Sequence, residues 1–538
     1  MKNRSLVILA TCFLSSLSLL SMAPLSGIGQ TGGRPRAVAP QAIVSPTPTP
    51  TPVSAQTIET LQAKIRQRLF APEVRRGRIG IKVVSLNSGK VIFESDSEKY
   101  FMPASNMKNF TVATAIEKLT PDFRFITTVK APTPPDSSGT IKGNLTIVGG
   151  GDISISNAFD PAFPQVVNPY WGIDRIVTSI VTTGVKRIEG DLVADESYFR
   201  GYSLPSTWEW DDLQSYYGAG ISALPLNDNA VDVSVVAGSA GNQCIVRISP
   251  LNTLIRIVNK CTTSAKGSKR SISVFKHLDD NVFEVSGTIA AGDNEYKESV
   301  AITRPAELLI TVLKQRLESK GVIVTGNARM ADNTLRSICP TCPQPPSVIV
   351  SKIESPPLSV IAAKTMKPSQ NMYTETLLWT LGEQIGRIST PTGDSSTLGL
   401  SVVRSFLKEV GIPADSIVQY DGSGLSRHDL ITPSAVTALY TYMAKQSRYS
   451  QAWRDSLTIG GVDGTLRNRF KGTAASGNIR GKTGTIDQVS ALSGYMTTAG
   501  GEQIVLSILV NGVPEPRNRL SLIDEIVVQL ANFDGKID

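Results

Sequence analysis

The sequence predicts an α/β (α+β) fold in which helices flank one antiparallel sheet and a strand-rich region interrupts the chain. Three observations lead to this fold class. At 538 residues, the chain is longer than one hydrophobic core usually supports. Strand-like apolar runs occur near both of its ends. Between about residues 129 and 350 the pattern changes to short apolar runs separated by turn residues, which predicts an insertion.

The amino-terminal part of the sheet is predicted as a hairpin that follows a helix. We expect the helix over about 57–70, a strand over 79–85, a turn at 87–89 and a partner strand over 90–94. Folded structure is therefore expected to start near Thr57.

The carboxyl-terminal part supplies the other strands of the same sheet. Segments 481–485, 490–497 and 503–510 are predicted as three strands, and the periodicity from about 518 to 531 predicts an amphipathic helix. Both chain ends therefore feed one sheet.

The insertion is predicted to be rich in strands. Its strand-like runs are 145–148, 231–236, 245–248 and 282–289. One helix is expected from Pro305 to Gly321, and it leads into a short strand at 321–324.

The amino terminus has the layout of a secretory signal. Lys2 and Arg4 precede an apolar stretch from Leu6 to about Met22, and Ser21-Met22-Ala23 offers small residues for cleavage, although Pro24 would follow the cut. We expect residues 1–23 to be a signal peptide or an uncleaved anchor. Residues 24–56, rich in Pro and Thr, are expected to form an extended linker. The expected location is the periplasm or cell envelope.

Charge and cysteine content narrow the function further. The formal net charge of +8 is spread thinly and contains no basic run, which argues against nucleic-acid binding. Outside the signal the cysteines are Cys244, Cys261, Cys339 and Cys342, which export would allow to pair as Cys244 with Cys261 and Cys339 with Cys342. A redox or zinc role for Cys339-Pro-Thr-Cys342 is the alternative.

A first chemical motif lies at Ser105-Asn-Met-Lys108. Pro103 and the helical spacing of the following apolar residues predict a helix start here, so Ser105 and Lys108 share one face. A serine hydroxyl is a weak nucleophile, and a lysine amine can activate it when burial lowers the pKa of the amine. The motif alone is weak, because Ser405-Phe-Leu-Lys408 has the same pattern.

Two further motifs follow in the chain. Ser369-Gln370-Asn371 lies between two predicted helices, at about 359–366 and 372–385, although Ser85-Leu-Asn87 and Ser476-Gly-Asn478 match the pattern equally well. Lys482-Thr483-Gly484 occurs on a predicted strand, where a fixed cation and hydroxyl could hold a carboxylate and Gly484 could let a peptide approach.

The order S-x-x-K, S-x-N, K-T-G resembles that of penicillin-binding proteins and class A β-lactamases. Over roughly residues 57–535, the chain resembles the low-molecular-mass (class C) penicillin-binding D-alanyl-D-alanine carboxypeptidases/endopeptidases of peptidase family S13. The long gap between Ser105 and Ser369 is similar to the gap between the first two motifs in that family. Further stretches that resemble this family are 149–152, 208–212, 222–229, 421–427 and 460–466. Gln370 departs from it, because Asp is frequent there.

The resemblance implies a serine β-lactamase/penicillin-binding-protein-like transpeptidase domain with two β-rich domains inserted between the first and second motifs. The implied domains are a catalytic domain over 57–128 and 351–538, an inserted domain II over 129–235 and 321–350, and a nested domain III over 236–320. The implied activity is that of a serine-type D-Ala-D-Ala carboxypeptidase, with endopeptidase activity as an addition. It would act on peptidoglycan stem peptides and bind β-lactams covalently.

The resemblance also implies residue roles. Ser105 would attack the substrate, Lys108 would take its proton, and Ser369 with Lys482 would pass a proton to the leaving amine. Backbone N–H groups of Ser105 and Thr485 would form an oxyanion hole. The residues implied in binding substrate are Asn371, Thr483, Gly484, Thr485, Arg427 and Asp212. Arg427 as a surface ion pair and Asp212 as a turn residue are the alternatives.

Other functions stay open at this stage. A Ser-His-Asp hydrolase would have to use His277 or His428, the two histidines of the chain. A non-catalytic wall-binding module and a β-lactamase-like hydrolase on the same fold are further alternatives. No cofactor, metal or nucleic-acid partner is expected, and membrane or cell-wall association is compatible with the sequence.

Overall fold

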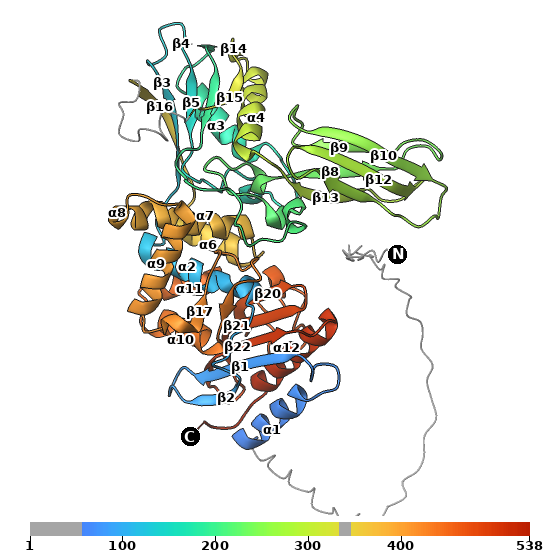
Figure 1. Ribbon diagram of the computed structural model, residues 1–538, viewed down its shortest axis with the longest axis vertical. Coiled ribbons are helices and arrows are strands. Elements are labelled where there is room, and N and C mark those ends of the chain that lie inside the picture. The colour runs from blue at the N-terminus through green and yellow to red at the C-terminus, as the bar shows by residue number, and fades with distance from the viewer. Residues whose placement is uncertain (1–55, 333–345, 538) are drawn as a thin grey trace, which may run out of the picture. The chain divides into compact units, whose positions relative to one another are not determined.

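A six-stranded antiparallel sheet unites the two ends of the folded chain (Figure 1). The computed structural model describes residues 56–332 and 346–537. The strand order is β19-β20-β21-β22-β1-β2. The strands are β19 (Thr458–Ile459), β20 (Arg480–Ile486), β21 (Val489–Thr497), β22 (Gln503–Asn511), β1 (Arg78–Ser85) and β2 (Val91–Ser95). The predicted fold class is confirmed.

One face of this sheet is covered by the first and last helices. α1 (Ile58–Leu69) packs against α12 (Pro516–Ala531), and both contact the sheet. The Thr57 hydroxyl accepts the N–H of Thr60 and fixes the start of α1, while Pro516 stands where a helix needs no N–H. Alternate residues of β1 and β22 fill the core between them, among them Ile81 and Ile508.

The opposite face packs on a layer of helices. These are α2 (Lys108–Leu119), α6 (Leu358–Met366), α7 (Asn371–Leu381), α9 (Ser395–Glu409), α10 (Pro433–Lys445) and α11 (Ser450–Ser456). Sheet residues such as Tyr495 and Leu509 share a core with them. Because both faces are covered, β21 and β22 are buried along nearly their whole length. The three sequence motifs lie on the side of the sheet that this layer of helices covers.

The first and last strands of the insertion pair with each other. β3 (Ile126–Ala131) pairs antiparallel with β16 (Val348–Glu354) in a five-stranded sheet of order β15-β7-β5-β3-β16. Its other strands are β15 (Ala328–Met330), β7 (Leu192–Asp195) and β5 (Leu145–Val148). A small sheet follows with the order β14-β6-β4, made of β14 (Ile323–Val324), β6 (Arg187–Glu189) and β4 (Thr140–Lys142).

Two three-stranded sheets make up the nested part of the insertion. One has the order β13-β8-β9 and the other β10-β12-β11. The strands are β8 (Ala230–Val236), β9 (Ile245–Ser249), β10 (Arg256–Ser264), β11 (Ser273–Lys276), β12 (Val282–Ala290) and β13 (Tyr296–Ala301), which lie close together in Figure 1. A disulfide joins Cys244 and Cys261, with their Cα atoms 5.4 Å apart.

The helix predicted at 305–321 is present as α4 (Pro305–Ser319). It packs on α3 (Trp171–Val181), β7 and β15. These elements belong to the region predicted as domain II, whereas α4 falls in the range predicted as domain III. The helix therefore packs with elements of the region predicted as domain II.

Some sequence predictions fall outside the described residues. They are the signal or anchor at 1–23, nearly all of the linker at 24–56, and the pairing of Cys339 with Cys342. Within 56–332 and 346–537, no helix has the length and apolar character needed to cross a bilayer.

Candidate active site

The S-x-x-K motif spans the change from a 3₁₀ turn to an α-helix. Ala104–Met107 form the 3₁₀ turn and Lys108 begins α2. Ala104 has a left-handed backbone with φ of 46°, which is uncommon for a residue other than glycine. The Lys108 Nζ lies 2.9 Å from the Ser105 Oγ. The structure thus brings these two side chains together, through a tighter turn than the predicted helix start.

The Lys108 amine is fully buried. Besides its contact with Ser105, the amine donates to the Asn371 Oδ1 and, at 2.8 Å, to the Ser423 carbonyl. Burial lowers the pKa of Lys108 from 10.5 to about 7. Nearby carboxylates oppose this fall, and they are Asp421, Glu375 and Asp429.

These contacts suit a neutral amine. A neutral lysine has two N–H donors and one lone pair. The Asn371 Oδ1 and the Ser423 carbonyl can accept both N–H groups, which leaves the lone pair for the Ser105 hydroxyl. The arrangement can therefore remove a proton from Ser105 at neutral pH.

The S-x-N motif lies between α6 and α7, as predicted. Ser369 has a left-handed backbone with φ of 68°, and Asn371 is the first residue of α7. The Lys482 Nζ lies 2.7 Å from the Ser369 Oγ. Asn371 uses both ends of its amide, because its Nδ2 donates at 2.9 Å to the Tyr217 carbonyl of the insertion.

The K-T-G motif lies on β20 beside the turn that carries Ser105. Lys482 is fully buried, and burial together with the charge of Lys108 lowers its pKa well below 10.5. The Thr483 hydroxyl lies 2.7 Å from the Thr465 hydroxyl, and Thr485 is exposed.

Gly484 was expected to make room for a peptide. A Cβ at this position would lie 2.5 Å from the Pro103 carbonyl oxygen. The glycine therefore lets β20 approach the 3₁₀ turn. The Asn106 Nδ2 also bonds to the Lys482 carbonyl at 3.1 Å, which ties the first and third motifs together.

Sequence reasoning missed two carboxylates behind Lys108. Glu375 accepts the backbone N–H groups of Gly422 and Ser423, and burial raises its pKa. Burial and the neighbouring Asp421 raise the pKa of Asp429 well above 3.8. Glu375 follows Asn371 by four residues, so the two share one face of α7, and the helix carries no other charged residue. A single acidic residue on the face that carries Asn371 was the sequence signal that could have identified Glu375.

Arg427 and Asp212 bond to residues outside the three motifs. The Arg427 Nε donates to the Glu209 Oε2 at 2.8 Å and its Nη1 to the Asp487 carbonyl at 3.2 Å. Asp212 bonds to Tyr217, and burial raises the pKa of its carboxyl. Arg427 thus forms an ion pair with the insertion, next to Asp212.

The competing motifs do not form comparable sites. Ser405 and Lys408 are both exposed on α9. The ring of His428 packs edge-on to Tyr420, and that of His277 lies beside Phe275. The residue that contacts the Ser105 hydroxyl is a lysine, which removes the basis for a Ser-His-Asp hydrolase.

Comparison with known proteins identifies the family of the chain. The model of the D-Ala-D-Ala carboxypeptidase 3 (S13) family matches residues 61–533. A D-alanyl-D-alanine carboxypeptidase from Actinomadura sp. (strain R39) is 31% identical over 525 residues, covering 94% of this chain and 92% of the relative. A D-alanyl-D-alanine carboxypeptidase DacB from Haemophilus influenzae is 24% identical, covering 81% of this chain and 85% of that protein.

The fold also matches a solved structure. The crystal structure of penicillin binding protein 4 (dacB) from Haemophilus influenzae has a TM-score of 0.71 at 22% sequence identity, and the match covers 86% of this chain and 99% of that one. The extent of the family match and of the Actinomadura relative together settle the assignment. The chain belongs to the S13 family of D-Ala-D-Ala carboxypeptidases.

Proposed function

We propose that this serine D-Ala-D-Ala carboxypeptidase uses Ser105 to cleave the terminal D-alanine from peptidoglycan stem peptides through an acyl-enzyme. The observation that carries the proposal is the contact of 2.9 Å between the Ser105 Oγ and the Nζ of Lys108, whose pKa burial lowers to about 7. A base with a pKa near the working pH combines sufficient deprotonation with good proton affinity.

In the acylation step, the Ser105 oxygen bonds to the carbonyl carbon between the two D-alanines while its proton passes to Lys108. The developing oxyanion is held by backbone N–H groups of Ser105 and Thr485. The bond from carbon to nitrogen then breaks, and the leaving amine takes a proton through Ser369, whose hydroxyl lies against the Lys482 amine. Water hydrolyses the ester, releases the shortened peptide and restores Ser105.

Substrate is bound along β20 and the motif junction. Asn371 would bond to the substrate amide, and Thr483 and Thr485 would bond to the terminal carboxylate. Arg427 and Asp212 would contact a diamino-acid side chain, which requires Arg427 to leave its ion pair with the exposed Glu209 carboxylate. An exposed pair of this kind is worth under about 1 kcal/mol, so exchange is feasible.

The same serine chemistry accounts for covalent binding of β-lactams, whose ring carbonyl would take the place of the peptide carbonyl. The amino-terminal pattern supports export, and with it a location in the periplasm or cell envelope and association with the wall or membrane. An exported enzyme would meet its peptidoglycan substrate there.

The test is release of D-alanine from a stem pentapeptide that ends in D-Ala-D-Ala. We expect release by the wild-type protein and none above background by Ser105→Ala. A cross-linked peptide dimer in parallel measures endopeptidase cleavage. Rapid turnover of benzylpenicillin with no release of D-alanine would instead indicate a β-lactamase-like hydrolase, and inactivity on every substrate would indicate a wall-binding module.

A further inference from the structure

The second motif of the active site is held in a strained conformation. Ser369 has φ of 68°, a left-handed conformation that non-glycine residues rarely adopt and that persists only where neighbours hold it. The two residues that follow each bond to the insertion. The Gln370 Nε2 donates to the Asp228 Oδ2 at 3.0 Å, and the Asn371 Nδ2 donates to the Tyr217 carbonyl at 2.9 Å.

Asp228 is built into the insertion as a rigid acceptor. Three successive residues, Asn227, Asp228 and Asn229, are left-handed, with φ of 46°, 60° and 56°. The flanking amides are fixed, because the Asn227 Nδ2 donates to the Pro169 carbonyl and the Asn229 Nδ2 to the Gly220 carbonyl, both at 2.8 Å. This strained segment directs the Asp228 carboxylate at the motif.

The Asp228 carboxylate receives donors from both parts of the chain. Ser156 of the insertion donates at 2.8 Å, and Gln370 and the hydroxyl of Tyr373 donate from the motif and α7. Burial raises the pKa of Asp228. An exchange of any donor for an acceptor at this buried site would leave oxygen facing oxygen.

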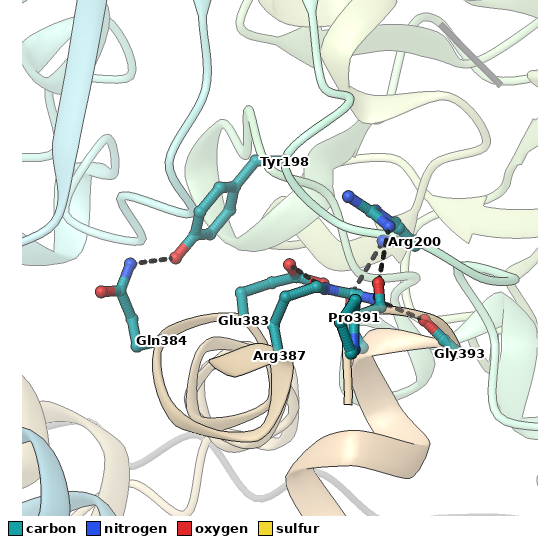
Figure 2. A network of polar contacts seen from close by, with 8 residues as sticks. Tyr198, Arg200, Glu383, Gln384, Arg387, Pro391 and Gly393 are labelled. Atoms are coloured by element: carbon teal, nitrogen blue, oxygen red, sulfur yellow. Dashed lines mark hydrogen bonds and ion pairs between the residues drawn. The ribbon is translucent and has the colours of Figure 1, made fainter. Parts of the chain in front are cut away.

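A second set of bonds joins the insertion to the far end of the same helical segment (Figure 2). The Gln384 Nε2 donates to the Tyr198 hydroxyl at 2.6 Å, and Arg200 donates to the Pro391 carbonyl. Gln384 lies in the π-turn Gly382–Gly386 that continues α7. At a helical rise of about 1.5 Å per residue, it is roughly 20 Å from Asn371 along the axis.

We propose that the insertion is a working part of the catalytic centre and that Asp228 is a positioning residue. Through Gln370 it fixes the backbone that carries Ser369 and Asn371, and Asn371 in turn contacts the Lys108 amine. The proposal rests on the proposed function, in which Ser369, Asn371 and Lys108 take part in acylation. The network of Figure 2, by contrast, contacts the same helical segment roughly 20 Å from the motif, and the proposal gives it no part in shaping the motif.

The hydrogen bond between Gln370 and Asp228 can be tested by exchanging the residue that donates with the residue that accepts. Gln370→Glu places a second carboxylate against the Asp228 Oδ2. Adding Asp228→Asn restores a donor and an acceptor with their positions exchanged, while the Oδ1 of the new asparagine still accepts from Ser156 and Tyr373. Asp228→Asn alone is expected to be mild, because the Gln370 Oε1, buried without a hydrogen-bond partner among the described residues, can turn to accept.

The measurement is the rate constant and apparent affinity for acylation by benzylpenicillin, with the melting temperature of each variant of the full chain. Gln370→Glu is expected to lower the rate constant by about 10- to 100-fold, as misplaced catalytic groups do. The double variant is expected to recover to within about threefold of the wild type. Tyr198→Phe, which breaks a bond of the Figure 2 network, is expected to change the acylation rate constant less than twofold, because this bond is distant from the motif and shares no partner with it.

Three results would overturn the proposal: wild-type acylation by Gln370→Glu, no recovery in the double variant, or an equal loss in Tyr198→Phe. If Gln370→Glu does not fold, Gln370→Ala removes the donor without adding charge and must still slow acylation. Absence of acylation in the wild type would contradict the proposed function itself, so the two failures are distinct.

Discussion

Two buried lysines each face a serine, and their electrostatic surroundings differ. Lys108 lies 2.9 Å from Ser105, and Lys482 lies 2.7 Å from Ser369. Burial lowers the pKa of both amines. For Lys108, carboxylates behind the amine oppose this effect, whereas for Lys482 the charge of Lys108 adds to it.

The difference separates two tasks that the same side-chain pair can perform. A lysine with a pKa of about 7 can gain and lose a proton during turnover. Lys482, whose pKa lies well below 10.5, contacts the Ser369 hydroxyl, through which the proposed mechanism passes a proton to the leaving amine. The carboxylates near Lys108 therefore limit the fall of its pKa, which suits the role of base that the proposed mechanism gives it.

The largest expected effect is the loss of the base. Lys108→Met removes the amine that accepts the Ser105 proton, and we expect acylation by benzylpenicillin to slow by about 10³-fold. Stopped-flow or mass-spectrometric acylation rates measure this. Lys408→Met, in the exposed look-alike motif, is the matched control and should acylate normally. Equal losses in both variants would contradict the assignment.

The second effect concerns the other pair. Ser369→Ala removes the hydroxyl that lies against Lys482, and acylation should slow by about 10²-fold, less than for Lys108→Met. The control is Ser476→Ala, which changes an exposed serine of the same S-x-N pattern. A Ser369→Ala enzyme slower than Lys108→Met would reverse the two roles.

The third effect is the dependence of acylation on pH. In the proposed mechanism the neutral form of Lys108 is the base, and burial favours this form by lowering the pKa of Lys108 to about 7. Acylation should therefore level off above pH 7 and fall by about tenfold per unit below it. A pH profile from 5 to 9 measures the midpoint. A midpoint near pH 10 would show that burial does not lower the pKa of this amine.

The smallest effect tests the carboxylates. Glu375→Gln keeps an oxygen to accept the N–H groups of Gly422 and Ser423 but removes a carboxyl whose charged form favours the Lys108 ammonium. Burial raises the pKa of Glu375 to about 8, so this charge is only partly present near pH 7. The midpoint should move to lower pH by less than about one unit. Glu409→Gln, which changes an exposed carboxylate paired with Lys118, should leave it in place. An upward shift would contradict the sign.

Much of the sheet could be predicted because its signals are local. The nearly continuous apolar run over 503–510 is enough to identify β22, and the three motifs could be found from their order along the chain. Local signals do not reveal partners distant in sequence. The bond between Gln370 and Asp228 joins residues 142 positions apart, and Gly484 faces Pro103 from the other end of the chain.

Backbone detail was also beyond local patterns. The sequence predicts a plain helix start at Ser105, but tertiary contacts impose a 3₁₀ turn with a left-handed Ala104. It predicts one helix over 372–385, whereas α7 ends at Leu381 and continues as a π-turn. In this turn Gln384 bonds to Tyr198 of the insertion, and Glu383 accepts from Ser395, which in turn accepts from the insertion. Such departures from regular geometry arise where two parts of the chain are fitted together.

The most direct test of the central claim is the intact mass of the purified protein before and after treatment with excess benzylpenicillin. Wild type and Ser405→Ala should each gain the mass of one penicilloyl group, and Ser105→Ala should gain none. An adduct that survives in Ser105→Ala, or a folded wild-type protein that neither gains mass nor hydrolyses the antibiotic, would contradict the assignment of Ser105 as the nucleophile.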